Sequence, residues 1–274
     1  VMVNRIWQHH FGRGIVATLD NLGEVGDRPT HPELLDWLAV EFMSNGWSIK
    51  HMHRLIMTSS TYRQSSEITS ASRRSDPRNE LLSHFPLKRL EAESLRDTML
   101  FVAGRLNRKP FGPSDSLSTR DDGLVTANAS GHGWRRSIYV QQRRKQLPTV
   151  LEAFDVPEMN PNCLERRSST VATQALYMMN NKMVHELAAS LADRIHEQVG
   201  DDSDRQIDAL YRIVLSRLPD QDQHAATKDA LFEMRKQWSE QATASDDQQR
   251  SPALRALDNL CHALLNSAEF VYVD

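Results

Sequence analysis

The sequence predicts a mainly α-helical, multi-helix globular domain with a long central loop rich in Gly and Pro. Apolar residues recur at helical spacing along most of the 274-residue chain, and residues that favour helix ends flank these segments. Residues 105–133 break the pattern, because they are rich in Gly, Pro, Ser, Asp and Asn and show little periodicity. We therefore expect helices packed around a buried core, with room for one small β-hairpin.

Three helices are expected in the N-terminal segment. The first covers residues 4–11 and ends before Gly12, since glycine readily takes the left-handed conformation of a helix C-cap. Thr30 and Glu33 have the spacing of a capping box at the start of the second helix. Ser48 is expected to cap the third helix, because a serine hydroxyl accepts a hydrogen bond from a backbone N–H in the first turn.

The central segment contains one strand candidate, residues 137–142, which carries β-branched and aromatic side chains. A strand needs a partner, and the preceding loop would have to supply it. Around this segment we expect a single helical domain over residues 1–274. Its two sub-lobes would cover residues 1–104 and 137–274, joined by the loop 105–136.

Helical patterns resume after the strand candidate and continue to the C-terminal end. Asn180 and Asn181 are expected to break one long helical stretch into two. A capping box begins at Ser203. The polar segment 239–250 lacks large apolar side chains, and a final helix with a leucine-rich face is expected from Pro252.

Composition narrows the class of protein. The chain is 39% hydrophobic and 25% charged, with a formal net charge of −3 and a pI of about 6.4. A dedicated nucleic-acid binder usually shows a strong basic excess, so no nucleic-acid partner is expected. No apolar run approaches the length of a transmembrane helix. The first residue is Val, and no signal-peptide pattern follows it, so we interpret the chain as a fragment of a longer protein.

The strongest chemical signal is basic and lies around the strand candidate. Arg135 and Arg136 precede it, and Arg143 and Arg144 follow it, with no acidic residue between them. Guanidinium groups match the geometry of carboxylate, sulfate and phosphate. Trp134 ends the loop beside Arg135, where an exposed indole would stack on a sugar ring. The alternatives are a solvated basic surface, or arginines paired with carboxylates of the helices.

Carboxylates on the helix expected near residues 90–104 form a second candidate site. Glu93 and Asp97 are spaced i, i+4 and share a helix face, whereas Glu91 and Glu93 are two residues apart and should diverge. This spacing suits an ion-pair network as readily as acid–base catalysis. A glycosidase-type pair is the catalytic alternative at these carboxylates. For the chain as a whole, the alternative to a binding module is a hydrolase or lyase of polysaccharides, with its site around residues 115–144.

Histidines and tryptophans give weaker signals. His9 and His10 point to different faces of a helix, and no zinc-binding spacing occurs, so no metal site is predicted. Trp7, Trp37 and Trp47 neighbour apolar helix positions and are expected in the core.

The two cysteines, Cys163 and Cys261, do not form a metal-binding or haem-attachment motif. They are either buried thiols or the two ends of a long-range disulfide. The disulfide requires an oxidising compartment.

A set of short motifs, in order along nearly the whole chain, resembles a known family. The motifs are Val3-Asn4-Arg5-Ile6-Trp7, Phe11-Gly12-Arg13-Gly14, His31-Pro32-Glu33-Leu34-Leu35-Asp36-Trp37-Leu38, Gly46-Trp47-Ser48, Arg89-Leu90-Glu91-Ala92-Glu93, Arg135-Arg136-Ser137-Ile138-Tyr139, Phe154-Asp155, Thr173-Gln174-Ala175-Leu176 and Leu264-Leu265-Asn266-Ser267. Together they resemble the planctomycete secreted domain catalogued as domain of unknown function 1553.

This resemblance implies a C-terminal helical domain of an exported, multidomain bacterial protein, located at the periplasm or cell surface. Such proteins often carry a cytochrome c-like domain upstream, so any haem would belong to that domain and no cofactor is expected in this chain. The implied partners are neighbouring domains of the parent chain and an acidic or carbohydrate ligand. The family carries no catalytic assignment that transfers to these residues.

Overall fold

A computed structural model describes residues 1–121, 123–129, 134–143, 146–157, 163, 166, 168–241 and 250–273. The chain forms two compact units, which we call unit 1 and unit 2. Unit 1 is built mainly from Val1–Lys88, and unit 2 from Arg89–Pro161 and Arg166–Val271. Helices dominate both units, and the sheets in the described residues have two strands each, which confirms the predicted mainly α class.

Unit 1 contains the three expected helices and one short additional helix. These are α1 (Met2–Phe11), α2 (Pro32–Ser44), α3 (Ile49–Thr58) and α4 (Ser70–Ser75). Gly12 ends α1 with a φ of 78°, and the Ser48 hydroxyl accepts a hydrogen bond from the His51 N–H at the start of α3, both as predicted.

The capping box predicted at the start of α2 was wrong. The N-cap is His31, and no side chain caps this helix. The Thr30 hydroxyl instead donates to the Ile15 carbonyl at 3.3 Å, and the backbone N–H of Thr30 donates to the same oxygen at 2.9 Å. Thr30 therefore joins the loop after α1 to the start of α2.

The end of α2 is a Schellman motif, a turn that satisfies the last helical carbonyls. Gly46 is left-handed, and its N–H binds the Met43 carbonyl at 3.1 Å. The Trp47 N–H binds the Phe42 carbonyl at 2.9 Å, and the two rings pack edge to face at 5.3 Å. Trp47 also has a positive φ, 60°, which is unusual for a bulky residue.

The tryptophans of unit 1 were only partly predicted. Trp7 is buried, but Trp37 is 52% exposed and Trp47 is 62% exposed. The reason is that α2 buries only Leu38 and Phe42, which lie one turn apart, and Trp37 falls outside that narrow stripe.

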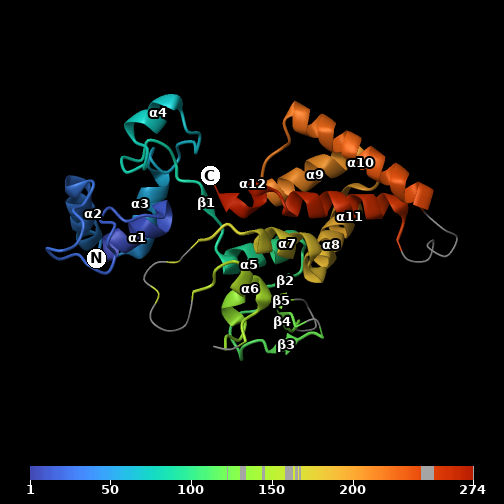
Figure 1. Ribbon diagram of the computed structural model, residues 1–274, viewed down its shortest axis with the longest axis horizontal. Coiled ribbons are helices and arrows are strands. Elements are labelled where there is room, and N and C mark those ends of the chain that lie inside the picture. The colour runs from blue at the N-terminus through green and yellow to red at the C-terminus, as the bar shows by residue number, and fades with distance from the viewer. Residues whose placement is uncertain are drawn as a thin grey trace. The chain divides into compact units, whose positions relative to one another are not determined.

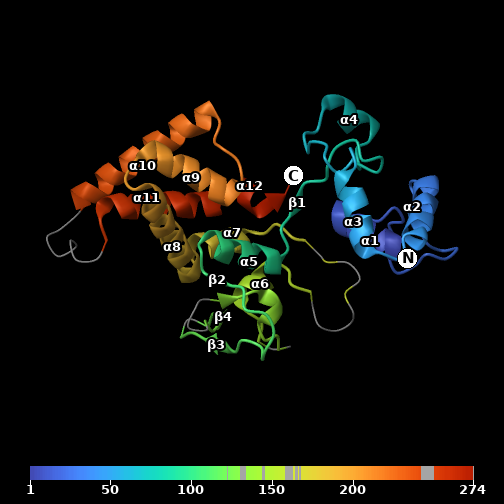
Figure 2. The ribbon, with the colours of Figure 1, turned by 180° about the vertical axis from the view of Figure 1, so that it is seen from behind.

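Unit 2 contains the helices from α5 onwards, among them the longest helices of the described residues (Figures 1 and 2). They are α5 (Ala92–Val102), α6 (Thr149–Ala153), α7 (Ala172–Asn180), α8 (Lys182–Val199), α9 (Ser203–Leu215), α10 (Gln221–Gln241), α11 (Pro252–Leu265) and α12 (Ala268–Val271). The predicted break at Asn181 is confirmed, since its side chain caps α8. Asp202, not the predicted Ser203, caps α9.

One hydrophobic cluster holds unit 2 together. It contains Leu95 and Leu100 from α5, Leu191 and Ile195 from α8, and Leu257 from α11, and each of these side chains is fully buried. Full burial of each such side chain contributes roughly 1.5–3 kcal/mol to the stability of the folded state.

Among the helices of the described residues, none combines the length and the apolar composition of a membrane span.

Short strands lie in the segment predicted to be a loop. Strand β2 (Leu106–Asn107) pairs in parallel with β5 (Trp134–Arg135). Strands β3 (Leu117–Thr119) and β4 (Val125–Ala127) form the small predicted hairpin. The remaining pair is β1 (Lys88–Arg89) with β6 (Tyr272–Val273).

The strand predicted over residues 137–142 was wrong. A 3₁₀ turn, η1 (Ser137–Tyr139), stands there, and Val140 joins Asp115 only through an isolated β-bridge. Hydrogen bonds to Asp97 of α5 hold Ser137 in place and outweigh the β propensity of the residues that follow it.

Candidate functional site

The turn η1 is attached to helix α5 through Asp97 and Ser137. The carboxylate of Asp97 accepts hydrogen bonds from the backbone N–H and the hydroxyl of Ser137, each at 2.7 Å. Arg96, the residue beside Asp97, donates to the Arg135 carbonyl at 3.0 Å and to the Ser137 hydroxyl at 3.2 Å. These bonds fix where the adjacent arginines point.

Arg96 is only 2% exposed, so its charge is supported by its neighbours. Burial lowers the pKa of this guanidinium, and the adjacent Asp97 carboxylate opposes that effect. Arginine stays charged in proteins, so Arg96 places a fixed positive charge beside the carboxyl group that holds η1. This is the ion-pair alternative that the sequence left open for the α5 carboxylates.

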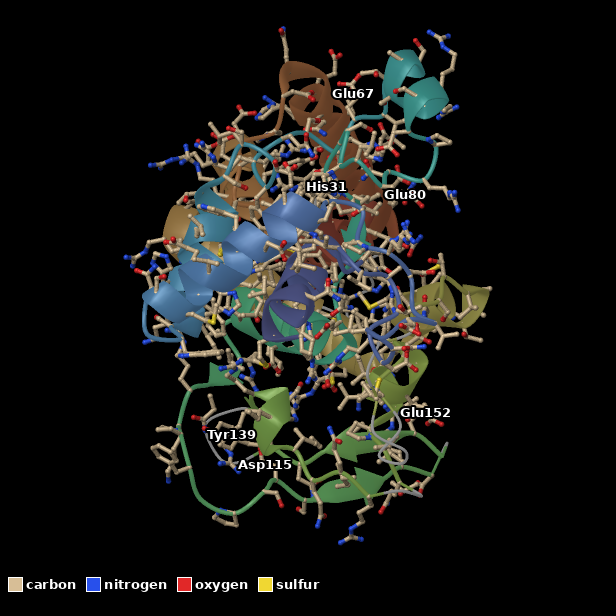
Figure 3. The ribbon with its side chains drawn as sticks, turned by 90° about the vertical axis from the view of Figure 1, so that its left-hand side faces the viewer. His31, Glu67, Glu80, Asp115, Tyr139 and Glu152 are labelled. Atoms are coloured by element: carbon tan, nitrogen blue, oxygen red, sulfur yellow. The ribbon has the colours of Figure 1, made fainter. Side chains whose placement is uncertain are left out.

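Arg135 is a buried structural residue of the central segment. Its guanidinium donates to Asp115 Oδ1 at 2.9 and 2.6 Å, to the Phe111 carbonyl at 2.8 Å and to the Pro113 carbonyl at 2.5 Å. It also lies over the ring of Tyr139, which is seen beside Asp115 in Figure 3. Its donors therefore hold residues of the loop.

Arg136, by contrast, has a side chain that is 63% exposed, and its Nε lies 3.4 Å from Asp97 Oδ2. It lines a cavity of about 790 Å³, which we call the α5 cavity. The charged side chains around it belong to Glu91, Glu93, Asp97, Arg136 and Arg166, and Ser94, Thr98, Ser137 and Gln142 add uncharged polar groups.

The α5 cavity also has an apolar part, formed by Phe101 and Ile138, which are 48% and 76% exposed. The polar part of the cavity includes Arg166, which donates to both carboxylate oxygens of Glu93, at 2.7 and 3.2 Å, and lies 3.5 Å from the carboxylate of Glu91. The cavity thus combines acceptors, donors and an accessible aromatic ring.

Glu91 and Glu93 line the same cavity, although helical spacing predicts that they diverge. The prediction was wrong because Glu91 is the N-cap of α5 and has extended backbone angles, φ −65° and ψ 150°. Only Glu93 follows helical geometry. A residue just outside a helix does not obey the angular spacing of the residues within it.

The central loop forms a second, smaller cavity of about 430 Å³, next to Arg135. Asn107, Lys109 and Asn128 contribute polar groups, and Phe111, 80% exposed, stands at its edge. The consecutive residues Arg135 and Arg136 therefore face two different cavities, and they do not converge on one ligand.

The other members of the predicted basic site are more dispersed. Trp134 packs against the core of unit 2, donates from Nε1 to the Ala127 carbonyl at 3.0 Å and lies under the Arg105 guanidinium. It is therefore not an exposed platform for a sugar ring. Arg143 is exposed and bridges to Gln146 through its backbone, while Arg144 lies outside the described residues.

A separate polar cluster surrounds Asp155, whose φ is 63°. Its carboxylate accepts hydrogen bonds from Arg89 at 2.6 Å, from the N–H of Ser169 at 2.8 Å and from Gln174 at 3.4 Å. Arg89 is 8% exposed and lies over the Phe154 ring. The cluster joins three segments of unit 2, and sequence spacing alone gave no signal for it.

Cys261 is buried and Cys163 is exposed, so the alternative of two buried thiols was wrong for Cys163. Burial raises the pKa of the Cys261 thiol well above its usual value. The disulfide between them stays a prediction. Within the described part of the chain, no group of three or more His, Cys, Asp or Glu side chains has the arrangement of a metal site.

The comparisons with known proteins identify a family but no characterised relative. No curated protein and no solved structure matches the chain. The family model described as PSD1, protein of unknown function (DUF1553), matches residues 1–231 and so covers α1 to α9, the α5 cavity and most of the motifs quoted above. The chain belongs to the DUF1553 family.

Proposed function

We propose that unit 2 is a non-catalytic binding module that takes a neutral carbohydrate in the α5 cavity. The observation that supports this is the composition of the cavity, in which carboxylates, guanidinium groups and hydroxyls surround a half-exposed aromatic ring. Its volume, about 790 Å³, lies within the range of small-molecule sites.

The polar groups suit a ligand with many hydroxyl groups. Each sugar hydroxyl can donate to a carboxylate such as Glu91 and accept from a guanidinium such as Arg136. The Arg108 guanidinium lies over one face of the Phe101 ring. The apolar face of a sugar ring can pack on the exposed remainder of this half-exposed side chain, since an aromatic side chain buries a large area at a low cost in conformational entropy.

The charges favour a neutral ligand over an anion. Three carboxylates line the cavity, against two guanidinium groups. Arg166 is already engaged by Glu93, and Arg136 lies beside Asp97. A sulfate or phosphate would therefore meet a net excess of negative charge and would have to displace existing ion pairs.

The setting of the module is a further part of the proposal. The resemblance to planctomycete secreted domains implies an exported multidomain protein, in which this domain docks against its neighbours. A carbohydrate site would then face polysaccharides outside the cytoplasm.

A polysaccharide hydrolase or lyase is the second candidate. It is favoured by the three carboxylates Glu91, Glu93 and Asp97 in one cavity. Arg166 donates hydrogen bonds to Glu93, and Ser137 donates to Asp97. Glu91, which lies 3.5 Å from Arg166, is therefore the carboxylate with the weakest contacts. Glu91 would be the first residue to test as an acid or base.

The test is a titration of the full chain with xylan, laminarin and carrageenan, followed by calorimetry and by an assay for new reducing ends. We expect binding to a neutral polysaccharide without cleavage, weakened about tenfold by Arg136→Ala and by Glu91→Gln. The matched control is Arg143→Ala, which removes another exposed arginine outside the α5 cavity.

Three results would contradict the proposal. Equal weakening by Arg143→Ala would show that the binding is not in the α5 cavity. A preference for sulfated carrageenan would reject the neutral ligand. Release of reducing ends that Glu91→Gln abolishes would establish the hydrolase in its place.

A further inference from the structure

Unit 1 contains an apolar groove that none of the preceding functions uses. Its volume is about 570 Å³, and we call it the unit 1 groove. Val3 and Phe42 form a buried floor, while Leu22, Met43 and Trp47 form exposed walls. The three wall residues are 42%, 49% and 62% exposed. Large apolar side chains gathered in this way indicate an interaction site.

The apolar surface continues along one face of α2. On α2, Val40 and Met43 lie three residues apart, Asp36 lies one turn before Val40, and Trp47 follows just beyond the turn that ends the helix. The spacing of Asp36, Val40 and Met43 is the one with which a helix presents a stripe to a second helix. Val40 is 56% exposed, so the stripe is accessible along its length.

The wall opposite α2 is held in place by hydrogen bonds, and the groove is therefore formed before any partner arrives. The Asn4 side chain binds both the N–H and the carbonyl of Val16, at 2.9 and 3.0 Å. The Thr18 hydroxyl donates to the Asn21 carbonyl and accepts from the N–H of Asp27. A preformed wall lowers the entropy lost on binding.

The charged side chains that line the unit 1 groove are acidic. Asp27 and Asp36 are exposed on its lining, and no Lys, Arg or His of the described residues lines it. Acidic and basic residues are nearly equal in number over residues 1–88, so the negative charge belongs to the groove and not to unit 1 as a whole.

From these observations we propose that the unit 1 groove binds an amphipathic helix of a partner protein, with apolar residues at i, i+3 or i+4 spacing and Lys or Arg beside them. The apolar residues insert between Leu22, Met43 and Trp47. The cations pair with Asp27 and Asp36, which gives orientation and selectivity more than affinity.

A second copy of this chain is a poorer occupant. The stripe of α2 that it would offer carries Asp36 and no cation, so it cannot supply the positive charge that the groove lacks. Self-association through Met43 is nevertheless an outcome that the experiment must be able to detect.

The experiment measures fluorescence anisotropy of two labelled helical peptides with the full chain. One peptide has Leu on one face and Lys on the other, and the second has Glu in place of Lys. We expect the Lys peptide to bind and the Glu peptide to bind at least about tenfold more weakly. Met43→Ser should weaken the Lys peptide about tenfold, because it removes an exposed wall residue without disturbing the core.

The double variant Asp27→Asn with Asp36→Asn should reduce the preference for the Lys peptide. Its matched control is Asp20→Asn with Glu24→Gln, which removes two exposed carboxylates outside the lining. Phe232→Ser on α10 is the apolar control, since Phe232 is 66% exposed and belongs to unit 2.

Several outcomes would overturn the proposal. These outcomes are equal binding of the two peptides, no binding of either peptide, and control variants that weaken binding as much as the groove variants do. Dimers in analytical ultracentrifugation that Met43→Ser abolishes would assign the groove to a second copy instead.

Discussion

Asp97 and Ser137, forty residues apart in the chain, are joined by two hydrogen bonds of 2.7 Å, one from the backbone N–H of Ser137 and one from its hydroxyl. This contact sets the direction of the whole segment from Trp134 to Val140. It also explains why Arg136 faces the α5 cavity while Arg135 is buried beside Asp115.

The first prediction concerns this contact. Asp97→Ala removes the acceptor of Ser137 and leaves the buried charge of Arg96 with weaker support. We expect the free energy of unfolding to fall by about 2–4 kcal/mol, as for other buried ion pairs that lose one partner. Urea denaturation followed by circular dichroism measures it.

Arg136→Ala is the matched control for Asp97→Ala. It removes the exposed charge on the opposite side of the same carboxylate and should change the free energy of unfolding by less than about 0.5 kcal/mol. A loss as large as that of Asp97→Ala would mean that Arg136, not Ser137, is the important partner of Asp97.

The second prediction concerns pH. His10 Nε2 lies 2.8 Å from His53 Nδ1 in unit 1. Burial, followed by the charges of His53, Lys88 and His9, lowers the pKa of His10 below its usual 6.5. The unfolded chain therefore takes up a proton at His10 before the folded chain does.

The contribution of His10 to the free energy of unfolding is complete above pH 6.5, the unfolded value, and is lost as the pH falls from there towards the folded-state pKa. Burial also lowers the pKa of His262 in unit 2, which adds to the trend. The denaturant concentration at the unfolding midpoint should decrease as the pH is lowered from about 7 to about 5. His10→Gln should reduce the slope; a flat profile for the unaltered protein would contradict the prediction.

The third prediction concerns Gly14, in the loop that forms a wall of the unit 1 groove. A Cβ on Gly14 would collide with the Val16 carbonyl and would lie 2.8 and 3.0 Å from the side-chain atoms of Asn4. Gly14→Ala should therefore cost about 1–3 kcal/mol in the free energy of unfolding.

Gly23→Ala is its control in the same loop, because a Cβ there meets only the Asn21 side chain, at 3.5 Å. Thermal unfolding should separate the two variants clearly. If both lower the melting temperature equally, steric contact at Gly14 is not the cause.

The fourth prediction concerns the cysteines. Cys163 is exposed and Cys261 is buried with a raised thiol pKa, and thiolate is the reactive form. Iodoacetamide should therefore add one label to the folded chain and a second only after denaturation, as measured by intact mass. Two thiols that stay unlabelled in denaturant until a reductant is added would instead establish the disulfide.

Sequence patterns predicted what local chemistry determines. The left-handed end of α1 at Gly12 and the cap of α3 at Ser48 depend on residues within one turn, and both are confirmed. The fold class follows for the same reason, since helical periodicity is a local property of the chain.

Features that depend on distant residues were predicted poorly. The segment from residue 137 has strand-like side chains, but its conformation is decided by Asp97 on α5. Of the predicted cationic site, only Arg136 reaches the α5 cavity, and Arg166 and Phe101 were missed because no spacing connects them to it. The charged residues around Asp155 likewise meet only after the chain has folded.

The position of α11 has a practical consequence for anyone who expresses this domain. The family match stops at residue 231, within α10, yet Leu257, Leu260 and Leu265 of α11 fill the interior of unit 2 alongside α8. A recombinant fragment trimmed at that boundary would leave the leucine-lined side of α8 open to water and prone to aggregate. During synthesis on the ribosome, too, the core of unit 2 cannot be completed until α11 has been translated.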